Sequence, residues 1–487
     1  MNKLEKHFEE FRHNTIGYGR MIPTAYGDKQ LRYCDYTASG RLYGPIEQKI
    51  AEDFGPLVGN THTETNLTGT AMTESYHYSR EKIKEHCNAG KKDILIHAGF
   101  GMTCGVNKLQ RILGLRVPEF FKPALSVRER PVVFLTHMEH HSNQITWLES
   151  IAEVVCLKPG PDGLVSLEHL EETLRRYRKR PAKIGSFTAC SNVTGIETPY
   201  HKIAGLMHQY GGLCFVDFAA SAPYRKIDMH PAMEEEHLDG IFFSPHKFLG
   251  GPGSSGVLIF DGSLYKNRVP DMPGGGTVEW TNPWGGRKYI DDIELREDGG
   301  TPGFLQSIRA ALSVVLKEKM GIEEMEERER RITSLAFREL ETVSGLHVLA
   351  PNVRDRLAII SFYAERIHYN LFVRLLNDRF GIQVRGGCSC AGTYGHYLLN
   401  INKKISKSIT DSINHGDLSH KPGWVRLSFH PMMTDEEVLF VTDAVREVAG
   451  SVEKWKEDYR YDKHSNQFFH RDPEKNNLIK PDVLFRL

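Results

Sequence analysis

The sequence has no excess of charge of either sign and no long apolar run. Among its 487 residues, Lys plus Arg and Asp plus Glu number 62 each, so the formal net charge is zero. A balanced charge gives no general attraction to nucleic acid or to an anionic membrane surface, which argues against both as partners. No run is long enough to cross a bilayer, and the N-terminal residues MNKLEKHFEEFRHN lack the apolar core of a signal peptide. We therefore expect a cytoplasmic protein.

Cysteines are also few. Eight of them in a chain of this length do not make a disulfide framework. Two, Cys388 and Cys390, lie in a glycine-rich stretch and need a separate explanation. The other six stand among mostly apolar neighbours and are expected to be small buried core residues: Cys34, Cys87, Cys104, Cys156, Cys190 and Cys214.

The remaining composition is that of an ordinary globular protein, with 40% hydrophobic and 25% charged residues. The chain is long enough for two or three domains with a large core. Residues 1–30 are polar and aromatic and are predicted to form an N-terminal arm. We expect a large domain over residues 31–303, a smaller C-terminal domain over residues 304–455 and a polar C-terminal tail over residues 456–487.

The large domain alternates apolar runs with helical or loop segments. This βαβ rhythm predicts an α/β domain with a mostly parallel seven-stranded sheet. Residues 166–180 are an example of an intervening helix, because leucines recur there at spacings of three and four. The glycine-rich span 272–303 is too long for a passive connection and is predicted to be a functional loop or interface element. The seven runs are DILIHA, PVVFLTH, AEVVCLK, AKIGSFTAC, LCFVDFAA, GIFFS and GVLIF.

After residue 303 the pattern becomes that of a second, α+β domain. One long amphipathic helix is predicted from Phe304 to about Val343. A last helix is predicted to begin at Thr434, where TDEE forms a capping pattern. Between these helices lie four strand-like runs, with a further helix between the second and the third run: residues 347–350, 358–362, 382–385 and 425–429.

Polar side chains follow four of the apolar runs of the large domain. In a parallel α/β sheet, ligands bind beyond the carboxyl ends of the strands, so these side chains are expected to meet at one edge. A strand-end carboxylate can keep a heterocyclic nitrogen protonated, a histidine can stack on a flat ring, and a lysine can condense with an aldehyde. These are the groups that pyridoxal phosphate requires from its protein. The residues in question are His137, His140 and His141, then Ser191 and Asn192, then Asp217, and finally Ser244, His246 and Lys247.

A phosphate site is predicted at the glycine-rich segment from Gly99 to Thr103, which includes Gly101. The segment precedes a helical pattern, so its backbone N–H groups and the Thr103 hydroxyl lie at a helix N-terminus, where an anion is favoured. A formal G-x-G-x-x-G at residues 251–256 leads into a strand instead of a helix and is rejected as a nucleotide site. The segment HMEHH fits no zincin spacing, so no metal site is predicted there.

Together these segments resemble the fold-type I pyridoxal phosphate enzymes of the class V aminotransferase group, and within it the cysteine desulfurase and selenocysteine lyase branch. The resemblance extends from about Leu31 to Gly450. SPHK at residues 244–247 matches the Schiff-base lysine motif, and VDFAAS at residues 216–221 matches the motif of the aspartate that pairs with the pyridinium nitrogen. The other matching segments are YCDYTASGR (33–41), EHHSNQITW (139–147), SNVTG (191–195) and GGTP (299–302).

This resemblance implies how the cofactor is bound. Lys247 would condense with the cofactor aldehyde and then move protons, Asp217 would hold the pyridinium proton, and His140 would stack on the ring. Asn192 would lie near the cofactor's phenolic oxygen, where the family often has a glutamine at the position of Ala220. A homodimer is implied, because the phosphate would be bound from both subunits: by Gly101, Thr103, Ser244 and His246 of one, and by the partner subunit's Thr301.

The resemblance also implies the substrate contacts. Arg426, in WVRLSFH, matches the family arginine that grips the substrate α-carboxylate, for which a planar bidentate donor is suited. Arg385 and Asn192 are predicted to contact the substrate as well.

The segment VRGGCSCAG, residues 384–392, decides the reaction. Desulfurases of the related type carry the sulfur-accepting cysteine five residues after an arginine, and here Cys390 follows Arg385 at that spacing. Its thiolate would attack the sulfur of a bound cysteine, leaving alanine and a persulfide. Cys388 could resolve the persulfide, form a redox pair with Cys390 or fill space. A metal or structural role for the C-x-C pair also stays open.

The sequence therefore predicts a homodimeric pyridoxal phosphate enzyme that takes sulfur from L-cysteine, with a protein sulfur acceptor as a further partner. One alternative is another class V enzyme in which Cys390 is incidental: an aminotransferase, an epimerase or a C–S or C–Se lyase. The other is a non-enzymatic protein that binds sulfur, metal or redox partners on the same scaffold. An insertion at residues 394–421, rich in Lys, Ser and His, follows the cysteine segment and is expected to shape acceptor docking or to close the site.

Overall fold

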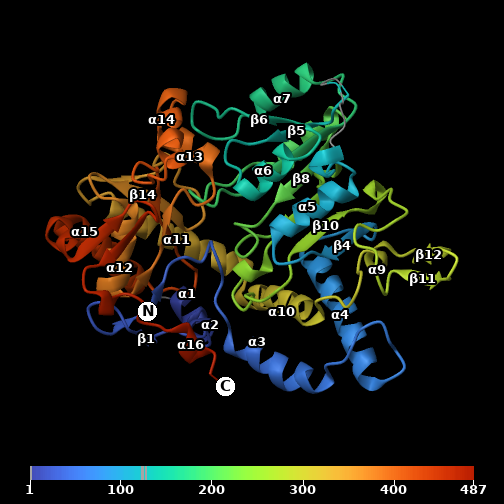
Figure 1. Cartoon of the computed structure of the whole chain (residues 1–487), viewed down its shortest axis with the longest axis horizontal. Helices are drawn as coiled ribbons and strands as arrows, with labels where there is room; N and C mark the ends of the chain where they lie inside the picture. The colour runs from blue at the N-terminus through green and yellow to red at the C-terminus, as the bar shows by residue number, and fades with distance from the viewer. Residues whose placement is uncertain (1–2, 122–125, 127–128, 487) are drawn as a thin grey trace. The chain divides into compact units, whose positions relative to one another are not determined.

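The computed structural model describes residues 3–121, 126 and 129–486, so the first two residues of the predicted arm and the last residue of the predicted tail lie outside the described residues. The chain forms two compact units. The large unit comprises residues 39–191 and 197–322, and the small unit comprises residues 1–38, 192–196 and 323–487. The chain therefore passes from one unit to the other four times (Figure 1).

This division differs from the predicted one at residue 304, at both termini and at residues 192–196, which were predicted in the large domain. Helix α10 (Phe304–Met320) belongs to the large unit, because it packs along α4 (Leu67–His86). The N-terminal residues and the tail belong to the small unit. The buried Glu5, for example, accepts a hydrogen bond from the backbone N–H of Asp435 at 2.7 Å. The predicted arm is thus an integral part of the small unit.

A seven-stranded sheet forms the centre of the large unit, in the order β4-β10-β9-β8-β7-β5-β6. Each of the seven predicted runs contributes one strand. Neighbouring strands from β9 to β6 are parallel, and β10 is antiparallel to both β4 and β9, so the sheet is mostly parallel, as predicted. The strands are β4 (Asp93–His97), β5 (Val132–Leu135), β6 (Glu153–Cys156), β7 (Lys183–Thr188), β8 (Leu213–Asp217), β9 (Gly240–Phe243) and β10 (Val257–Asp261).

Helices in the connections cover this sheet (Figure 1). They are α5 (Met102–Ile112), α6 (His141–Leu148), α7 (Leu167–Arg176) and α8 (Tyr200–Gln209). Val106 and Leu109 of α5 join Val133, Phe215 and Leu258 of the sheet in one buried apolar cluster. Full burial of such side chains stabilises the fold by about 1.5–3 kcal/mol each. The predicted functional span 272–303 contains the hairpin β11 (Val278–Thr281) and β12 (Arg287–Tyr289), which extends away from the sheet, and α9 (Ile293–Arg296).

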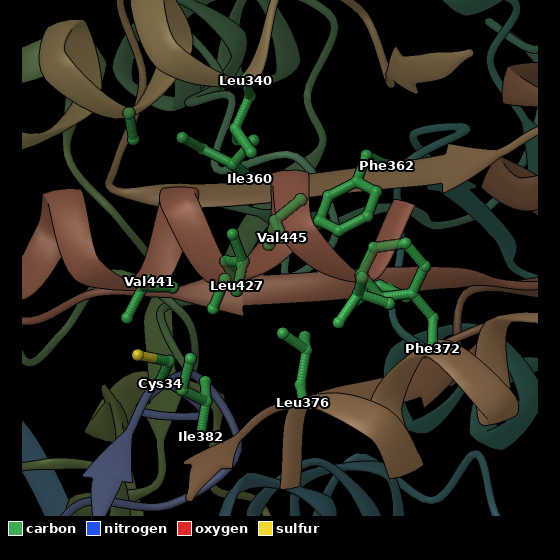
Figure 2. Close-up of a cluster of buried hydrophobic side chains, with 14 of the residues drawn as sticks. Cys34, Leu340, Ile360, Phe362, Phe372, Leu376, Ile382, Leu427, Val441 and Val445 are labelled. Atoms are coloured by element: carbon green, nitrogen blue, oxygen red, sulfur yellow. The ribbon is translucent and has the colours of Figure 1, made fainter. Parts of the chain in front are cut away.

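The small unit contains an antiparallel sheet in the order β13-β14-β17-β16. Its apolar core includes Ile360 and Phe362 of β14, Leu427 of β17, Phe372 of α12 and Val445 of α15 (Figure 2). The capping box predicted at Thr434 is present at the start of α15. The elements are α11 (Ile322–Leu340), β13 (Leu346–Val348), β14 (Ile359–Ala364), α12 (Tyr369–Phe380), β15 (Ile382–Gln383), β16 (Arg385–Gly387), β17 (Trp424–Ser428) and α15 (Asp435–Trp455).

Shorter elements complete both units. In the large unit α3 spans Gly44–Lys49. The predicted insertion 394–421 contains α14, which follows α13. The short elements of the small unit are α1 (Lys3–His7), α2 (Glu9–His13), β1 (Met21–Ile22), β2 (Lys29–Gln30), β3 (Arg32–Tyr33), α13 (Gly392–Leu398), α14 (Lys403–Asn414), β18 (Tyr459–Asp462), β19 (Gln467–His470) and α16 (Pro481–Leu484).

Two predictions about local structure are wrong. The long helix from Phe304 to Val343 is two helices, because Gly321 between α10 and α11 has φ 82°, a left-handed conformation that ends a helix. Of the six cysteines expected in the core, Cys156 is exposed and Cys104 is only half-buried, while the other four are buried. Cys156 ends β6, the edge strand of the large sheet, which explains its exposure. Within the described residues, no helix is long and apolar enough to cross a membrane.

Candidate active site

The carboxyl ends of six strands lie at one edge of the large sheet, and five of these strands are followed by predicted site residues. Strands β5, β7, β8 and β9 run in parallel, and β4 runs in the same direction because both β4 and β9 are antiparallel to β10. The structure therefore brings together the residues predicted to follow these strands, from Gly99–Thr103 after β4 to Lys247 after β9. Asn192 is the exception, because it belongs to the small unit.

Asp217 is the last residue of β8 and is buried. Its Oδ1 accepts a hydrogen bond from the Ala219 N–H at 2.8 Å. Burial raises the pKa of Asp217 from 3.8 to about 6, against the lowering effects of this hydrogen bond and of the Lys247 charge. A buried carboxylate in this position favours a cationic partner, such as a protonated ring nitrogen.

Lys247 ends a short 3-10 turn, Pro245–Lys247, that follows β9. Its backbone N–H donates to the Ser244 carbonyl at 3.0 Å, and its side chain is half-buried. Burial and, to a smaller extent, the Lys247 charge lower the pKa of the neighbouring His246 to about 4. His246 is therefore neutral near pH 7, and its imidazole can offer one N–H donor.

Gly101 precedes α5 as its N-cap residue. The first N–H of the helix, that of Met102, donates to Ser244 Oγ at 2.9 Å. A Cβ built on Gly101 would lie 2.9 Å from Ser244 Oγ and 3.5 Å from His246 Nε2. A helix N-terminus, a hydroxyl and an imidazole thus lie close together beside Gly101, and these groups are of the kind that binds phosphate.

His140 is the N-cap residue of α6, and its Nδ1 accepts a hydrogen bond from the Ser142 N–H at 3.1 Å. The Thr103 hydroxyl lies 2.7 Å from Ser142 Oγ, so the histidine segment is tied to the start of α5. Thr301 is exposed and its hydroxyl donates to Asn60 Oδ1 at 3.2 Å. The predicted contact of Thr301 with a partner subunit's phosphate stays a prediction.

Glu139 is a site residue that sequence reasoning missed. It is buried, and its Oε1 accepts hydrogen bonds from the Thr136 N–H (3.1 Å), the Thr136 hydroxyl (2.6 Å) and the Thr188 N–H (3.0 Å). Its Oε2 accepts from Asn143 Nδ2 at 2.8 Å. Burial raises the pKa of Glu139 to about 7. Glu139 therefore joins β5, β7 and α6 directly before His140, and its neighbour His140 was the signal that could have found it.

In the small unit, Asp35 lies between the two predicted substrate arginines. Its Oδ1 accepts from Arg426 Nη2 at 2.8 Å and its Oδ2 accepts from Arg385 Nε at 3.1 Å. Arg426 is buried, and burial lowers its pKa although Asp35 opposes this effect. Sequence reasoning missed this role of Asp35, although the residue lies in the matched motif YCDYTASGR.

Asn192 links Arg426 to the cysteine segment. Its carbonyl accepts a hydrogen bond from Arg426 Nη1 at 3.0 Å, and its Nδ2 donates to the Ser389 carbonyl at 2.7 Å. Two buried polar atoms, Asn192 Oδ1 and Arg426 Nε, have no hydrogen-bond partner in the described part of the chain. An acceptor and a donor are thus available for the amino and carboxylate groups of an amino acid.

The cysteine segment has an unusual backbone. Ser389 and Cys390 have φ of 51° and 57°, a left-handed conformation that costs a non-glycine residue about 1–2 kcal/mol. Cys390 is exposed and Cys388 is half-buried. The Ala391 N–H closes the turn by donating to the Cys388 carbonyl at 3.0 Å. Such strain is held in place by surrounding contacts and is often found at functional sites.

Comparison with known proteins gives consistent results. The model of the family described as "Aminotransferase class-V" matches residues 32–441. A curated relative named "Probable cysteine desulfurase" from Halalkalibacterium halodurans is 27% identical over 365 residues, which are 74% of this chain and 84% of the relative. A relative of the same name from Staphylococcus aureus is 26% identical over 367 residues, with the same two shares.

Two solved structures share the fold. The apo cysteine desulfurase from Thermococcus onnurineus superposes with a TM-score of 0.69 at 22% identity, covering 86% of this chain and 95% of its own. The cysteine desulfurase CsdA from Escherichia coli also gives a TM-score of 0.69 at 22% identity, covering 91% and 98%. This likeness confirms the predicted fold class, in which a mostly parallel seven-stranded sheet is accompanied by a smaller α+β part.

Proposed function

Because the chain belongs to the class-V aminotransferase family, an enzyme family, we propose that it is a pyridoxal phosphate-dependent cysteine desulfurase. It converts L-cysteine to L-alanine and takes the sulfur on Cys390. The observation that carries this proposal is the exposed Cys390 in a strained turn whose Ser389 carbonyl is held by Asn192, the residue that also binds Arg426. The names of the relatives, probable cysteine desulfurases, support the same reaction.

The large unit supplies groups that suit the cofactor. Lys247 offers the amine, the buried Asp217 offers a counter-charge for a ring nitrogen, and His140 offers a ring for stacking. Gly101, Ser244 and His246 offer a space lined by donors for the phosphate, and Thr103 adds a hydroxyl nearby. When bound, pyridoxal phosphate stabilises negative charge that develops on the carbon atoms of an amino-acid substrate.

Arg426, Arg385 and Asn192 would orient the substrate. The α-carboxylate would accept hydrogen bonds from the two guanidinium groups, which Asp35 holds in place before the substrate binds. Asn192 Oδ1 would accept a hydrogen bond from the substrate. Lys247, once its amine is released, would move a proton from the substrate Cα.

Sulfur transfer is then a single displacement. The Cys390 thiolate attacks the substrate Sγ and forms an S–S bond, while the substrate Cβ–Sγ bond breaks. The electron pair of that bond stays with the carbon, which takes up a proton to give the methyl group of alanine. The products are L-alanine and a persulfide on Cys390.

The predicted partners belong to this proposal. A homodimer would bring the partner subunit's Thr301 to the phosphate, and the exposed position of Thr301 is compatible with such a contact. The proposal also includes a protein that accepts the persulfide sulfur and docks near the insertion 394–421. It places the enzyme in the cytoplasm.

The decisive experiment is to incubate the purified protein with L-cysteine and to measure alanine, sulfide and labile sulfur on each cysteine by mass spectrometry. We expect alanine formation with a persulfide on Cys390, and loss of both in Cys390→Ala and Lys247→Ala. Cys156→Ser, which removes an exposed thiol of the large unit, is the matched control and should keep full activity.

Two outcomes would overturn the proposal. If Cys390→Ala still forms alanine and sulfide at the wild-type rate, the chain runs another reaction of its family, such as C–S lysis. If the purified protein is colourless and Lys247→Ala does not change its absorption, it does not carry pyridoxal phosphate.

A further inference from the structure

Two histidines and an aspartate come together in the large unit, away from the candidate active site. His208 lies near the end of α8, His237 follows a 3-10 turn at Glu234–Glu236, and Asp239 directly precedes β9. His208 Nε2 is 2.9 Å from Asp239 Oδ2, and His237 Nε2 is 3.8 Å from Asp239 Oδ1. The two imidazole rings are stacked, with centroids 4.1 Å apart and an interplanar angle of 13°.

The hydrogen bonds of the two rings fix where their protons lie. His208 Nδ1 is 2.6 Å from the Glu235 carbonyl, and His237 Nδ1 is 2.8 Å from the Glu234 carbonyl. A carbonyl oxygen only accepts, so each Nδ1 carries a hydrogen. In the neutral rings, both Nε2 atoms are therefore lone-pair acceptors, and both lie near the Asp239 carboxylate, which is an acceptor as well. Three acceptors facing one another are unfavourable unless a cation lies between them.

Protonation of the two histidines does not fully relieve the repulsion among these three acceptors. One proton on His208 Nε2 satisfies its contact with Asp239 Oδ2, at 2.9 Å. A second proton on His237 would put two positive rings 4.1 Å apart. His237 Nε2 is then left facing the carboxylate as a lone pair.

Asp239 is well placed to act as an anionic ligand. It is buried, and the Cys214 N–H donates to its Oδ2 at 2.6 Å, which fixes the carboxylate. The exposed side chains of Glu234 and Glu235 add negative charge nearby. The surroundings therefore favour a divalent cation over a second proton.

We propose that His208 Nε2, His237 Nε2 and Asp239 bind a divalent transition-metal ion, Zn²⁺ being the best match, with water completing the coordination. The three side chains offer ligand atoms that all lie within 4.8 Å of one another. Two imidazoles and a carboxylate suit Zn²⁺ rather than Mg²⁺. The Nδ1–H bonds to backbone carbonyls are the outer contacts that orient histidine ligands in metal sites.

The position of the site indicates its role. It lies at the amino end of β9, whereas Ser244 and Lys247 follow the carboxyl end of the same strand. A metal ion here would join α8, the Glu234–Glu236 turn and β9, and would stabilise the strand that carries Lys247. The role is structural and does not depend on the proposed desulfurase activity.

The test is titration of the purified, chelator-treated full-length protein with Zn²⁺ and, separately, Mg²⁺, followed by calorimetry and thermal unfolding. We expect Zn²⁺ binding that raises the melting temperature and no such effect of Mg²⁺. His237→Ala should weaken this binding by about 100-fold or more, since even outer-sphere substitutions cost 10–100-fold.

Two comparisons keep the test specific. His230→Ala removes a partly exposed histidine that also pairs with an aspartate, Asp93 at 2.6 Å, and should leave Zn²⁺ binding unchanged. His237→Gln keeps a donor for the Glu234 carbonyl and should fold normally while losing the metal.

Thiols are themselves zinc ligands and the chain has free cysteines, so the cobalt-loaded protein provides a second readout. We expect d–d absorption that is lost in His237→Gln, without a thiolate charge-transfer band. If His237→Gln binds Zn²⁺ as tightly as the wild type, or if the cobalt spectrum shows thiolate ligation that persists in this variant, the proposal is wrong.

Discussion

The Asp35 carboxylate pairs with two arginines, Arg426 and Arg385. A substrate carboxylate that binds the same arginines would compete with Asp35. Arg426 is buried, so before the substrate binds its charge depends on Asp35 at 2.8 Å. A substrate α-carboxylate approaching Arg426 and Arg385 would bring a second negative charge to the same donors. Asp35 would thus keep the two arginines positioned, but its negative charge would repel the substrate carboxylate and weaken substrate binding.

Replacing Asp35 with Asn should therefore separate stability from substrate binding. The variant leaves Arg426 without a counter-charge, which should lower the free energy of unfolding by up to about 3 kcal/mol. L-Alanine, which carries the same α-carboxylate as the substrate, should restore more stability to the variant than to the wild type. Chemical denaturation with and without L-alanine measures both effects.

Asp411→Asn, on the exposed α14, is the control and should change neither quantity. Equal stabilisation of Asp35→Asn and wild type by L-alanine would mean that the substrate does not compete with Asp35 for Arg426.

Asp217 should make the cofactor-free protein less stable as the pH rises. Its folded-state pKa of about 6 lies above the 3.8 of an ordinary aspartate, so the fold favours the protonated carboxyl group. The stability that this group contributes is complete below about pH 4 and is lost as the pH rises through 6. One pKa unit corresponds to about 1.4 kcal/mol, so Asp217→Asn should gain about 2–3 kcal/mol at pH 8 and nothing at pH 4. Urea unfolding of the cofactor-free protein at both pH values measures this difference.

Asp298→Asn is the contrasting control, because Asp298 is a buried carboxylate paired with Arg80. It should lose stability at pH 8. A loss of stability in Asp217→Asn at that pH would show that the carboxylate is stabilised by its surroundings even without a cofactor.

Single residues were predictable from the sequence where their position in a strand pattern carried the information. Asp217 and Lys247 follow apolar runs, and parallel strands bring such residues to one edge. The contacts of Asp35 and Glu139 were not predictable, although Glu139 precedes a predicted site residue, because these contacts join residues that are distant in the sequence or on other elements. Nothing in the sequence around Asp35 indicates that residues 385 and 426 share its carboxylate.

At the scale of elements, the break between α10 and α11 shows where periodicity misleads. Both helices have apolar faces, so the pattern runs on across Gly321 as if there were one helix. Helix α10 ends at a single glycine, Gly321. A glycine lowers the stability of a helix only slightly, so its presence alone does not predict a helix end, but it also readily adopts the left-handed conformation that ends one.

Gly321→Ala should test this assignment. With φ at 82°, an alanine there should lower the free energy of unfolding by about 1–2 kcal/mol. Gly450, in the middle of α15 and with no atom within 4 Å of an added Cβ, is the matched control. Gly450→Ala should be neutral or should stabilise the protein by up to about 1 kcal/mol, as alanine is favoured in helices. Equal effects of the two substitutions would contradict the assignment.

At the scale of the whole molecule, the N-terminal residues are part of the small unit's core. Phe8 and Phe11 are buried, and Arg12 Nη1 donates to the Met432 carbonyl at 2.6 Å. Glu5 approaches the buried Arg328, with 3.5 Å between Oε1 and Nη2. The sequence predicted the sheet and the order of the elements, because these depend on local pattern. It did not predict that residues 1–38 complete a unit formed mainly by residues 323–487, since no local pattern records such a long-range contact.

Deleting residues 2–14 should therefore weaken the small unit selectively. Each buried phenylalanine contributes about 1.5–3 kcal/mol, so the loss should be several kcal/mol. Hydrogen exchange should accelerate in α12 and α15, while peptides from β7 and β8 keep their protection. Deletion of residues 477–486, nearly all of which are exposed, is the control and should leave both regions protected. Unchanged exchange in α15 after the N-terminal deletion would mean that residues 2–14 are a dispensable arm.

The division of the small unit between both ends of the chain has a consequence during protein synthesis. All segments of the large unit have been made once residue 322 is complete, whereas residues 1–38 emerge first and have no partner until residues 323–487 follow. At about 5–20 residues per second, the buried phenylalanines of the N-terminus would wait on the order of 25–95 s until the last residues of the small unit are made. During that interval they are the part of the nascent chain most in need of a chaperone.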